Sequence, residues 1–509
     1  MARTTARFLR EGRALPPELE TARVEIEALA RSYGLDFFDT IFEMCTYEEI
    51  NMVASYGGFP TRYPHWRFGM EYVQMQKSYE YGLSKIYEMV INTDPSYAYL
   101  MDCNLVVDQK LVMAHVFGHV DFFKNNLWFK GTNRRMLDQM ANHATRIRDL
   151  MDRHGTAEVE AFIDQCLSID NLVDPYALHI KRTRSSSEAE IETAEADGSI
   201  ARLPAKDYMD PYINPPEFLA SQAEKRQEVL DRMRAFPESP VRDVLGFMLD
   251  HARLPRWKHE VMDIIRDEAM YFAPQGQTKI MNEGWATYWH TKLMTQHILT
   301  DAEVIDYADA NSGTLAMRPG QLNPYKLGLE LWRHIEMRWD KGRFGKAWLD
   351  CDDPRKRAAW DTEAMKGRDK IFQVRQTHND ITFLETFLTA DFCRAMGFFT
   401  TKFDKRSGEW VLDSREFADV KQQLLQMLAS RGTPRVYVVD GNHANRSELR
   451  LWHEHEGLDI QLDWATVTLE NLAALWGRPV HLDTQVDGKP VRLSHDGATA
   501  SRSPLKEAS

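Results

Sequence analysis

Cysteine is scarce in this 509-residue chain, and its few cysteines stand apart from one another. The five are Cys45, Cys103, Cys166, Cys351 and Cys393. None forms a CxxC pair, and an odd number cannot all pair within one chain, so we expect reduced thiols in a reducing compartment. The sequence also lacks an internal repeat, a phosphate-binding P-loop, a dinucleotide-binding glycine fingerprint and a nucleophile elbow. These absences argue against a disulfide scaffold and several common enzyme classes.

Long apolar runs and an excess of positive charge are missing as well. No stretch approaches the roughly 18 apolar residues of a membrane span, and the N-terminus is polar rather than a charged leader followed by an apolar segment. Lysine and arginine total 63 against 76 aspartate and glutamate residues, a formal charge of −13. This balance argues against phosphate-dominated nucleic-acid binding. With 43% hydrophobic residues, the sequence predicts a folded cytoplasmic protein of two or three domains.

Two histidines in an apolar segment are the first sign of chemistry. His115 and His119 lie four residues apart in the run LVMAHVFGHVDFFKNNLW, residues 111–128. On an α-helix, residues i and i+4 share a face, so both imidazoles would point toward one spot, as metal coordination requires. A buried, hydrogen-bonded histidine beside an incidental one would give the same pattern, because such pairs arise often on helices.

A second segment, KIMNEGWATYWHTKLMTQH at residues 279–297, supplies a carboxylate. Glu283 lies in Asn-Glu-Gly-Trp-Ala, and His290 follows seven residues later, about two helical turns along the same face. A carboxylate in an aromatic helix is costly unless it is paired with a cation or binds a metal. The alternative to a metal ligand is a salt bridge to a buried arginine or lysine.

Together the two segments resemble the zinc site of gluzincin metallopeptidases, in which two histidines on one helix and a glutamate from a later helix hold the metal. The NEGWA segment is similar to the motif of the aminopeptidase branch. The resemblance implies that His115, His119 and Glu283 bind zinc and leave an open position for water. The peptidase motif is HExxH, and its glutamate is the general base, whereas the residue after His115 here is Val116.

Four residues are candidates for the missing catalytic groups. Glu260 and Glu268 lie in the acidic segment KHEVMDIIRDEAMYF, which precedes NEGWA. Asp121 follows the histidine pair, and His378 lies in the segment THND as a reserve ligand or proton donor. A solvated acidic helix face and a capped helix start are the structural alternatives for these residues.

Candidate substrate-binding residues flank the same motifs. Arg62 and His65 lie in YGGFPTRYPHWRFGME, a loop of glycines, prolines and aromatics that packing by the aromatics would also explain. Asn125 comes shortly after the histidine pair, and His290 lies in the NEGWA segment's helix. We expect these four side chains to face the substrate, where a histidine would stabilise charge developing on a carbonyl oxygen.

The periodicity predicts a mainly α-helical protein: a large helical body that resembles a zincin-like metal-binding core, with a small C-terminal α+β domain. The pattern also predicts a helix over 37–54 and a short strand over 97–101. The predicted parts, in chain order, are a flexible tail at 1–14, a helical part with the histidine pair at 15–182, a flexible insertion at 183–206, a helical part with the NEGWA motif at 207–400, the α+β domain at 401–485 and a partly disordered tail at 486–509.

Further segments extend the resemblance beyond the metal motifs. HVFGHVDFFKNN, NEGWATYWH, NPYKLG, RWDKGRFG, the THND segment and YVVDGNHANRSELRLWHEHEG together resemble the SpoVR family, over residues 20–485. The resemblance implies a cytoplasmic bacterial protein. In spore formers the family is linked to formation of the spore cortex, a peptidoglycan layer, and the resemblance itself supplies no biochemical activity.

Three hypotheses follow from these residues. The first is a zinc-dependent hydrolase of amide or peptide bonds, with a peptide-like or cell-wall-derived substrate. The second is a non-haem iron, manganese or other redox metal protein that uses the same histidines, in keeping with the surrounding tyrosines and tryptophans. The third is a non-catalytic, peptidase-like protein that binds a partner, and Val116 in place of the general base is its best support. The identity of the bound metal would separate the first two.

Overall fold

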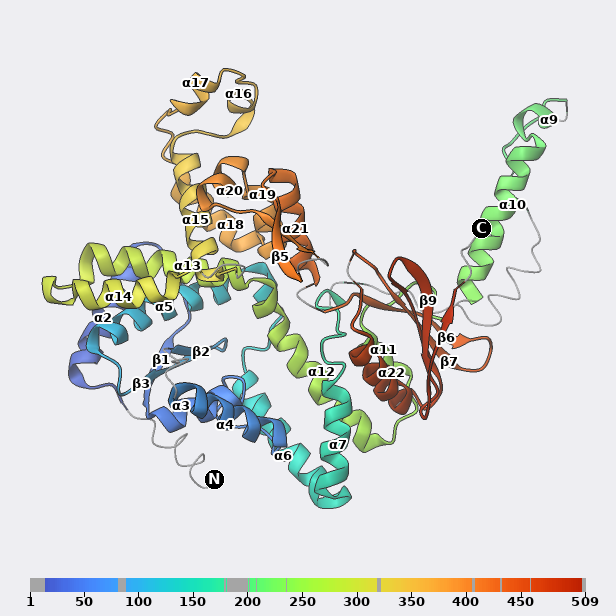
Figure 1. Ribbon diagram of the computed structural model, residues 1–509, viewed down its shortest axis with the longest axis horizontal. Helices are drawn as coiled ribbons and strands as arrows, with labels where there is room; N and C mark the ends of the chain where they lie inside the picture. The colour runs from blue at the N-terminus through green and yellow to red at the C-terminus, as the bar shows by residue number, and fades with distance from the viewer. Residues whose placement is uncertain are drawn as a thin grey trace. The chain divides into compact units, whose positions relative to one another are not determined.

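The computed structural model describes residues 14–80, 88–177, 180, 200, 202–206, 208–234, 236–317, 322–404, 408–430, 433–457 and 459–505 (Figure 1). The chain forms two compact units, Met1–Thr156 with Tyr271–Arg431, and Ala157–Met270 with Gly432–Ser509. The sequence predicted consecutive parts instead, because composition does not reveal that a chain leaves a unit and returns to it. The predicted flexible segments, 1–14 and 183–206, lie outside the described residues except at their ends.

The first unit is mainly helical and carries two small sheets. Its elements are α2 (Pro17–Ser32), β1 (Thr40–Cys45), α3 (Tyr47–Ser55), α4 (Trp66–Glu80), β2 (Glu88–Ile91), β3 (Ser96–Met101), α5 (Val106–Asn125), η1 (Leu127–Phe129), α6 (Met136–His154), α13 (Lys279–Leu293), η3 (Met294–Ile298), η4 (Asp301–Glu303), α14 (Val304–Leu315), α15 (Pro324–Asp340), α16 (Gly345–Leu349), α17 (Pro354–Ala358), α18 (Gly367–Thr377), α19 (Asp380–Phe387), α20 (Ala390–Met396), β4 (Thr400–Asp404), β5 (Glu409–Ser414) and α21 (Phe417–Ser430).

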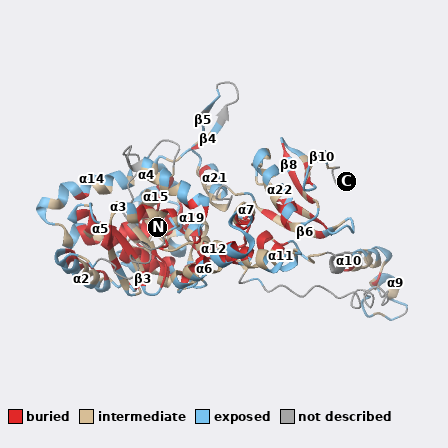
Figure 2. Ribbon diagram, turned by 90° about the horizontal axis from the view of Figure 1, so that it is seen from below, coloured by how far each residue is buried: buried red, intermediate tan, exposed pale blue. Residues whose placement is uncertain are grey.

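Helix α5 lies at the centre of the first unit. It is apolar on nearly all sides, as a helix surrounded by protein must be, and every residue from Val112 to Phe123 is buried (Figure 2). Helix α13 packs along it, and α15 packs on α13. Three fully buried tryptophans, Trp285, Trp289 and Trp332, fill the space around this stack. Helices α5 and α13 therefore run through a large apolar core of the helical body, and a second, smaller apolar cluster lies around α3 and β3.

A three-stranded sheet in the order β1-β3-β2 flanks these helices. The predicted strand at 97–101 is confirmed as β3, which pairs in parallel with β1 from Thr40 opposite Ser96 to Cys45 opposite Met101. The predicted helix over 37–54 is wrong in its first half, because β1 occupies 40–45 and only α3 is helical. The pairing of β1 with β3 joins segments more than 50 positions apart, so local periodicity gave no sign of it.

The second unit combines helices with a five-stranded sheet in the order β10-β9-β8-β7-β6. Its elements are α7 (Thr156–Leu167), α9 (Asp210–Ile213), α10 (Pro216–Arg234), α11 (Val244–His251), α12 (Arg256–Gln277, which continues into the first unit), β6 (Val436–His443), β7 (Glu448–His453), α22 (Leu462–Trp476), β8 (Val480–Val486), β9 (Lys489–His495) and β10 (Ala500–Pro504). The predicted α+β part is thus divided, since β4, β5 and α21 belong to the first unit.

The C-terminal sheet extends further than the sequence predicted. Strands β9 and β10 lie within the segment where a partly disordered tail was expected. Asp487 and Gly488 both adopt positive φ, 52° and 71°, which closes a tight hairpin between β8 and β9. A mainly helical protein with a C-terminal sheet is confirmed, and the zincin-like core remains a prediction. None of the helices in the described ranges combines the length and apolarity that a membrane span requires.

Candidate metal centre

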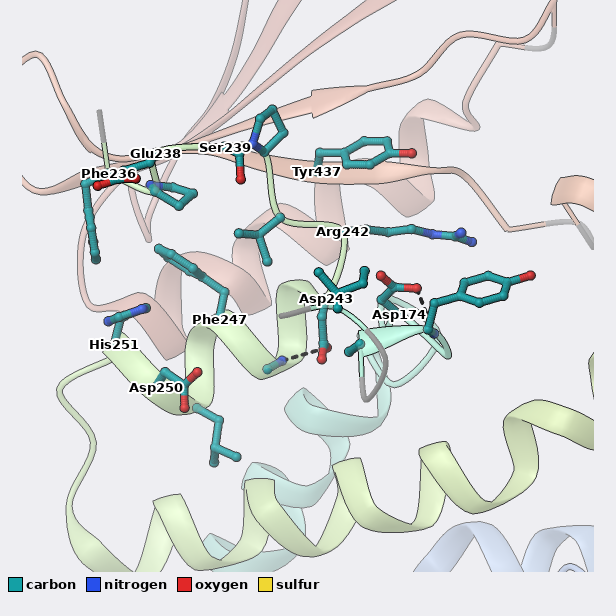
Figure 3. A pocket seen from close by; sticks show the side chains of 18 of the residues that line it. Asp174, Phe236, Glu238, Ser239, Arg242, Asp243, Phe247, Asp250, His251 and Tyr437 are labelled. Carbon is teal, nitrogen blue, oxygen red and sulfur yellow. Dashed lines mark hydrogen bonds between the residues drawn. The ribbon is translucent and has the colours of Figure 1, made fainter. Parts of the chain in front are cut away.

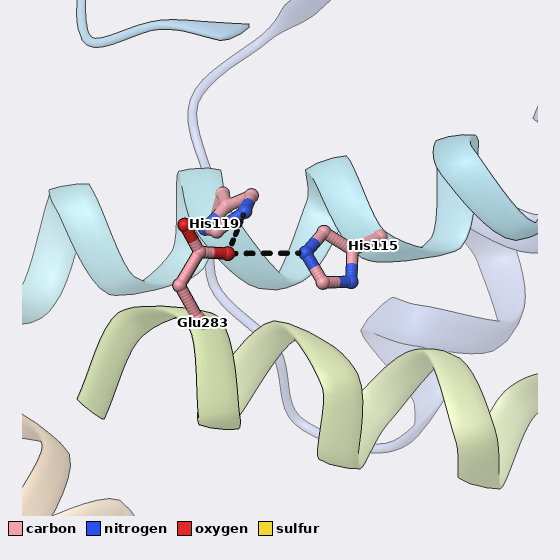
Figure 4. Close-up of side chains that lie close together, drawn as sticks. All are labelled: His115, His119 and Glu283. Atoms are coloured by element: carbon pink, nitrogen blue, oxygen red, sulfur yellow. Dashed lines mark ion pairs between the residues drawn. The ribbon is translucent and has the colours of Figure 1, made fainter. Parts of the chain in front are cut away.

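The two histidines and the glutamate meet where α5 crosses α13. Glu283 Oε2 lies 3.6 Å from His115 Nε2 and 3.4 Å from His119 Nε2 (Figure 4). Among the residues that the structure describes, these three form the one group of histidine, cysteine or acidic side chains with the spacing of a metal site. Both histidines are buried, and the Glu283 side chain keeps 15% of its exposure. The structure therefore brings together all three sequence-predicted metal ligands.

The spacing of these atoms fits a shared ion better than direct hydrogen bonds. Hydrogen bonds between nitrogen and oxygen are typically about 2.7–3.2 Å long. Tetrahedral zinc binds nitrogen and carboxylate oxygen at about 2.0–2.2 Å, which places two of its ligand atoms about 3.4 Å apart. The observed 3.4 and 3.6 Å match the second arrangement. Two of the three donor pairs thus have the spacing that zinc and similar small divalent metals require, and all three donor atoms lie within 4.8 Å of one another.

The two neighbouring imidazoles favour the ionised form of the Glu283 carboxyl group. Burial alone would raise the pKa of the Glu283 carboxyl, but His115 and His119 beside it hold that pKa well below its usual range. The carboxylate is therefore ionised at neutral pH. An ionised carboxylate in this surrounding needs a positive partner, either a proton on an imidazole or a metal ion between the three side chains.

Both ligand histidines use Nδ1 for a second contact. His119 Nδ1 lies 2.9 Å from Asn282 Oδ1, and His115 Nδ1 lies 2.7 Å from His290 Nδ1. His290 Nε2 in turn lies 3.1 Å from Asn311 Oδ1 on α14. Burial, reinforced by the neighbouring His115, holds the pKa of His290 well below its usual value. A histidine that binds metal through one nitrogen commonly uses its other ring nitrogen in a hydrogen bond that orients the ring, and both histidines have such a contact here.

Small residues let the helices approach closely enough to form the site. A Cβ atom on Gly118, between the two histidines, would lie 2.7 Å from Ala286 Cα on α13. On the other side of α13, a Cβ atom on Gly284 would lie 2.4 Å from the backbone of Gly328 on α15. Only glycine fits at such a crossing, because any side chain would push the backbones apart. The glycines of HVFGH, NEGWA and NPYKLG thus allow α13 to pack closely against both α5 and α15.

Asp121, predicted as a catalytic acid, lies in a buried ion pair with Arg375 from α18. Its carboxylate also accepts hydrogen bonds from the backbone N–H of Asp36 at 2.7 Å and from Trp285 Nε1 at 2.8 Å. Together with Asn125 Nδ2 at 3.5 Å, these donors converge on one fully buried carboxylate and join α5, α13 and α18. These contacts give Asp121 a structural part that the sequence pattern did not reveal.

In the THND segment, the aspartate rather than the histidine contacts the helix that carries Glu283. Asp380 accepts hydrogen bonds from the backbone N–H groups of Ile280 and Met281, both at 2.9 Å, at the start of α13. An anionic side chain at a helix start satisfies free N–H groups and complements the helix dipole. His378, the predicted reserve ligand, contacts Thr377 Oγ1 through Nδ1 at 2.9 Å and is not part of the three-ligand cluster.

The predicted substrate-binding residues of the aromatic loop make local contacts. Arg62 donates to the backbone carbonyl of Tyr56 at 3.2 Å and lies 4.8 Å above the Phe68 ring. His65 is buried, and its Nδ1 accepts from the backbone N–H of Arg67 at the start of α4. These contacts match the packed-loop alternative, and the substrate-binding roles of Arg62 and His65 remain predictions.

The other predicted residues fall in different surroundings. Asn125 donates to the backbone carbonyl oxygens of Asp36 and Asp121, both at 2.7 Å, which ties the end of α5 to a neighbouring loop. Glu260 is partly exposed and Glu268 is buried, and both lie on the part of α12 that belongs to the second unit. Neither belongs to the three-ligand cluster, so their roles as general base remain predictions.

Three residues near the cluster were not predicted from the sequence. Asn282 precedes Glu283 directly, so its place in NEGWA was a usable signal. Tyr325, in NPYKLG, has its ring 6.1 Å from the ring of His115, and its position at the start of α15 was not linked to the metal motifs. Nothing in the sequence marked Asn311 as part of the site, because it lies on a polar helix outside all of the motifs named above.

A cavity of about 820 Å³ lies within the second unit, between α11 and the segment that leads into it (Figure 3). Its lining includes an aromatic cluster of Phe236, Phe247 and His251, whose ring centroids are 4.6–5.5 Å apart. The buried carboxylate of Asp243 faces it and accepts from the N–H of Gly246. None of the sequence-predicted site residues lines this cavity.

Comparison with known proteins finds a family model and a relative that each cover most of the chain. A family model described as SpoVR like protein matches residues 14–433. The uncharacterized protein YcgB of Escherichia coli (strain K12) is 29% identical over 504 residues, which cover 93% of each chain. No solved structure matches the chain. The matched region includes α5, α13 and α14, and therefore the complete candidate metal centre.

Proposed function

The chain belongs to the SpoVR family, and from the geometry of its three-ligand cluster we propose that it binds one divalent metal ion, zinc in the first instance. We further propose that it uses this ion to hydrolyse amide or peptide bonds. His115, His119 and Glu283 are the proposed ligands. Three protein ligands leave a fourth position of a tetrahedral ion for water, as in catalytic rather than structural zinc sites.

One observation carries the proposal: two imidazole Nε2 atoms and one carboxylate oxygen converge at 3.4 and 3.6 Å. The Nδ1 atoms of both imidazoles face other partners, at 2.7 and 2.9 Å. A cation between the three atoms would balance the charge of the ionised Glu283 carboxylate without a proton on either Nε2 atom, which supports a metal ion as the occupant.

The bound ion would supply the main chemical activation, since it lowers the pKa of water at the open position to about 7. This chain needs a further group to move the proton, because Val116 is fully buried in the apolar core where a gluzincin carries its base. The base for that task stays a prediction at Glu268 or Glu260, which belong to the second unit and lie outside the three-ligand cluster. Tyr325, whose ring lies near His115, is a candidate donor to the developing oxyanion.

The proposed substrate is a peptide-like or cell-wall-derived amide. Its support is indirect: the ligand set matches amide hydrolases, and the resemblance of the chain to the SpoVR family links it to peptidoglycan of the spore cortex. A substrate with a bacterial peptide stem therefore belongs in the first screen, beside generic peptide amides as comparison.

A second candidate function is oxygen or redox chemistry at iron or manganese. Two histidines and one carboxylate also form the facial triad of non-haem iron(II) enzymes. Val116, an apolar and fully buried side chain at the position of the hydrolytic base, argues against hydrolysis and is the best support for a non-catalytic role. A non-catalytic, peptidase-like binding role is the remaining alternative, and it predicts no need for a bound metal.

The test is metal analysis of the purified protein beside the variants His115→Ala, His119→Ala and Glu283→Ala. His143→Ala is the matched control, because His143 is a buried histidine that contacts Gln139 and lies outside the cluster. We expect about one zinc per chain in the wild type and in the control, and loss in all three ligand variants. Iron or manganese with the same variant pattern would favour the redox function. Full metal content in Glu283→Ala would reject this ligand set.

Hydrolysis is tested separately on the zinc-loaded protein. Release of a free amine from peptide amides or peptidoglycan fragments should depend on zinc and disappear in Glu283→Ala. A protein that holds zinc stoichiometrically but releases no amine from any of these substrates would keep the metal site and remove the hydrolase assignment.

A further inference from the structure

Helix α14 reaches the candidate metal centre through a chain of hydrogen bonds. The chain runs from His115 Nδ1 to His290 Nδ1 at 2.7 Å and from His290 Nε2 to Asn311 Oδ1 at 3.1 Å. His115 lies on α5, His290 on α13 and Asn311 on α14, so the chain crosses three helices. His115 and His290 are buried, and the first contact lies in the protein interior.

The donor and the acceptor of each of these hydrogen bonds follow from which ring nitrogens carry a hydrogen. Asn311 Oδ1 can only accept, so His290 Nε2 must carry the hydrogen that joins them. A neutral His290 then has a lone pair on Nδ1, which accepts from His115 Nδ1–H. A neutral His115 with hydrogen on Nδ1 then offers the lone pair of Nε2 to the ion that it would share with Glu283. If the amide nitrogen of Asn311 stood in place of Oδ1, it would donate to His290 Nε2. Each donor and acceptor would then exchange roles, and His115 would carry its hydrogen on Nε2.

We propose that Asn311 is a positioning residue that fixes His115, through His290, in the tautomer that a metal ligand requires. The inference rests on the proposed metal site. It adds that the site is complete only when α14 is seated on the body. His119 has its own direct partner, Asn282, so the dependence on α14 is confined to His115.

Helix α14 buries few side chains against its neighbours, so a change in its packing can be coupled to metal binding. Of the described residues of α14, only Tyr307 is buried, and Val304 and Ile305 are exposed. An ion pair between Lys110 on α5 and Glu303 at 2.8 Å holds its start. A helix with so little buried surface opens at low cost. Because coupling between two events is reciprocal, metal binding should hold α14 closed to the same extent that seated α14 favours the metal.

The test measures zinc affinity by competition with a chelator in wild type, Asn311→Ala, Asn311→Asp and Ser312→Ala. Asn311→Ala should weaken zinc binding about 10- to 100-fold, the usual effect of removing a supporting partner of a ligand histidine. Asn311→Asp should stay within a few fold of wild type, since a carboxylate also only accepts. Ser312→Ala, at the exposed neighbouring position, should leave the affinity unchanged.

A second measurement needs no metal. Nitrogen-15 NMR of histidine-labelled apoprotein identifies which ring nitrogen of His115 carries the hydrogen. We expect Nδ1–H in wild type and Asn311→Asp, and a mixture in Asn311→Ala. Wild-type affinity in Asn311→Ala, or Nε2–H on His115 in wild type, would overturn the positioning role. The first of these results would leave the metal site itself intact, whereas absence of zinc binding in wild type would reject the proposed site as well.

Discussion

Replacing Gly118 by alanine tests whether the close crossing of α5 and α13 sets the spacing of the three donor atoms. The new Cβ would lie 2.7 Å from Ala286 Cα and 3.2 Å from Ala286 Cβ. Carbon atoms in ordinary contact are about 3.5–4.0 Å apart, so the helices must separate locally by about 1 Å. No flexible side chain can absorb the shift, because the clash is with backbone.

Two energies act on this variant in opposite directions. Overpacking of a well-packed core costs about 1–3 kcal/mol. Alanine in the middle of a helix recovers about 0.5–1 kcal/mol relative to glycine. We therefore expect the free energy of unfolding, measured by chemical denaturation of the apoprotein, to fall by about 0.5–2 kcal/mol.

The metal centre should be affected more than the fold. A separation of about 1 Å would move Glu283 Oε2 well beyond the roughly 3.4 Å that two ligand atoms of one tetrahedral zinc can span. Functional sites tolerate only about 0.5 Å of displacement. We expect zinc affinity, measured by chelator competition, to fall by at least about tenfold, which corresponds to about 1.4 kcal/mol of binding free energy.

Gly69→Ala is the matched control for Gly118→Ala. Gly69 lies in α4, and a Cβ atom there would meet nothing within 4 Å. This variant should gain about 0.5–1 kcal/mol of stability and bind zinc as the wild type does. Wild-type zinc affinity in Gly118→Ala, together with a gain in stability like that of the control, would refute the claim that this crossing sets the site.

The remaining predictions concern residues that hold the site in place and the pH dependence of the fold. Asp121→Asn leaves Arg375 buried without its charge partner, so denaturation should show a loss of about 3–5 kcal/mol; loss of activity at unchanged stability would instead favour a catalytic role. Asp380→Ala removes both caps on α13 and should cost about 1–2 kcal/mol in the same assay, while an unchanged midpoint would contradict the capping role. Burial, with the nearby Arg338 cation, lowers the pKa of His334 to about 4. The unfolded chain therefore takes up this proton first as pH falls below about 6.5, and stability should decline by up to about 2–3 kcal/mol between pH 6.5 and 4. His334→Gln should flatten that decline, and an identical pH profile in the variant would exclude His334 as its source.

Local patterns were enough to find the three side chains of the candidate metal centre. The four-residue spacing of His115 and His119 is a property of one helix, so it can be read without knowing the neighbours of that helix. The carboxylate of Glu283 was conspicuous because an acid in an aromatic helix needs a partner. The mainly helical character and the C-terminal strands followed from hydrophobic periods in the same way.

Elements that depend on distant pairing were not predictable from these patterns. Strand β1 reads locally as a helix, and only its ladder with β3 makes it a strand. The strands after Val486 were taken for a partly disordered tail, and their pairing with β8 makes them part of a sheet. In each case a segment with weak local preference takes the structure of the partner that pairs with it.

The sequence by itself determined which residues could bind a metal, because side-chain chemistry and helical spacing are local properties. The tertiary structure alone decided that His115 and His290, 175 positions apart, share a hydrogen bond, and that Asn311 stands at the end of their chain. It also decided that Asp121 forms an ion pair with Arg375, and that glycines at two helix contacts determine how closely the helix of Glu283 packs on its neighbours. These facts depend on which helices pack together and how closely, and no local pattern encodes a distance between helices.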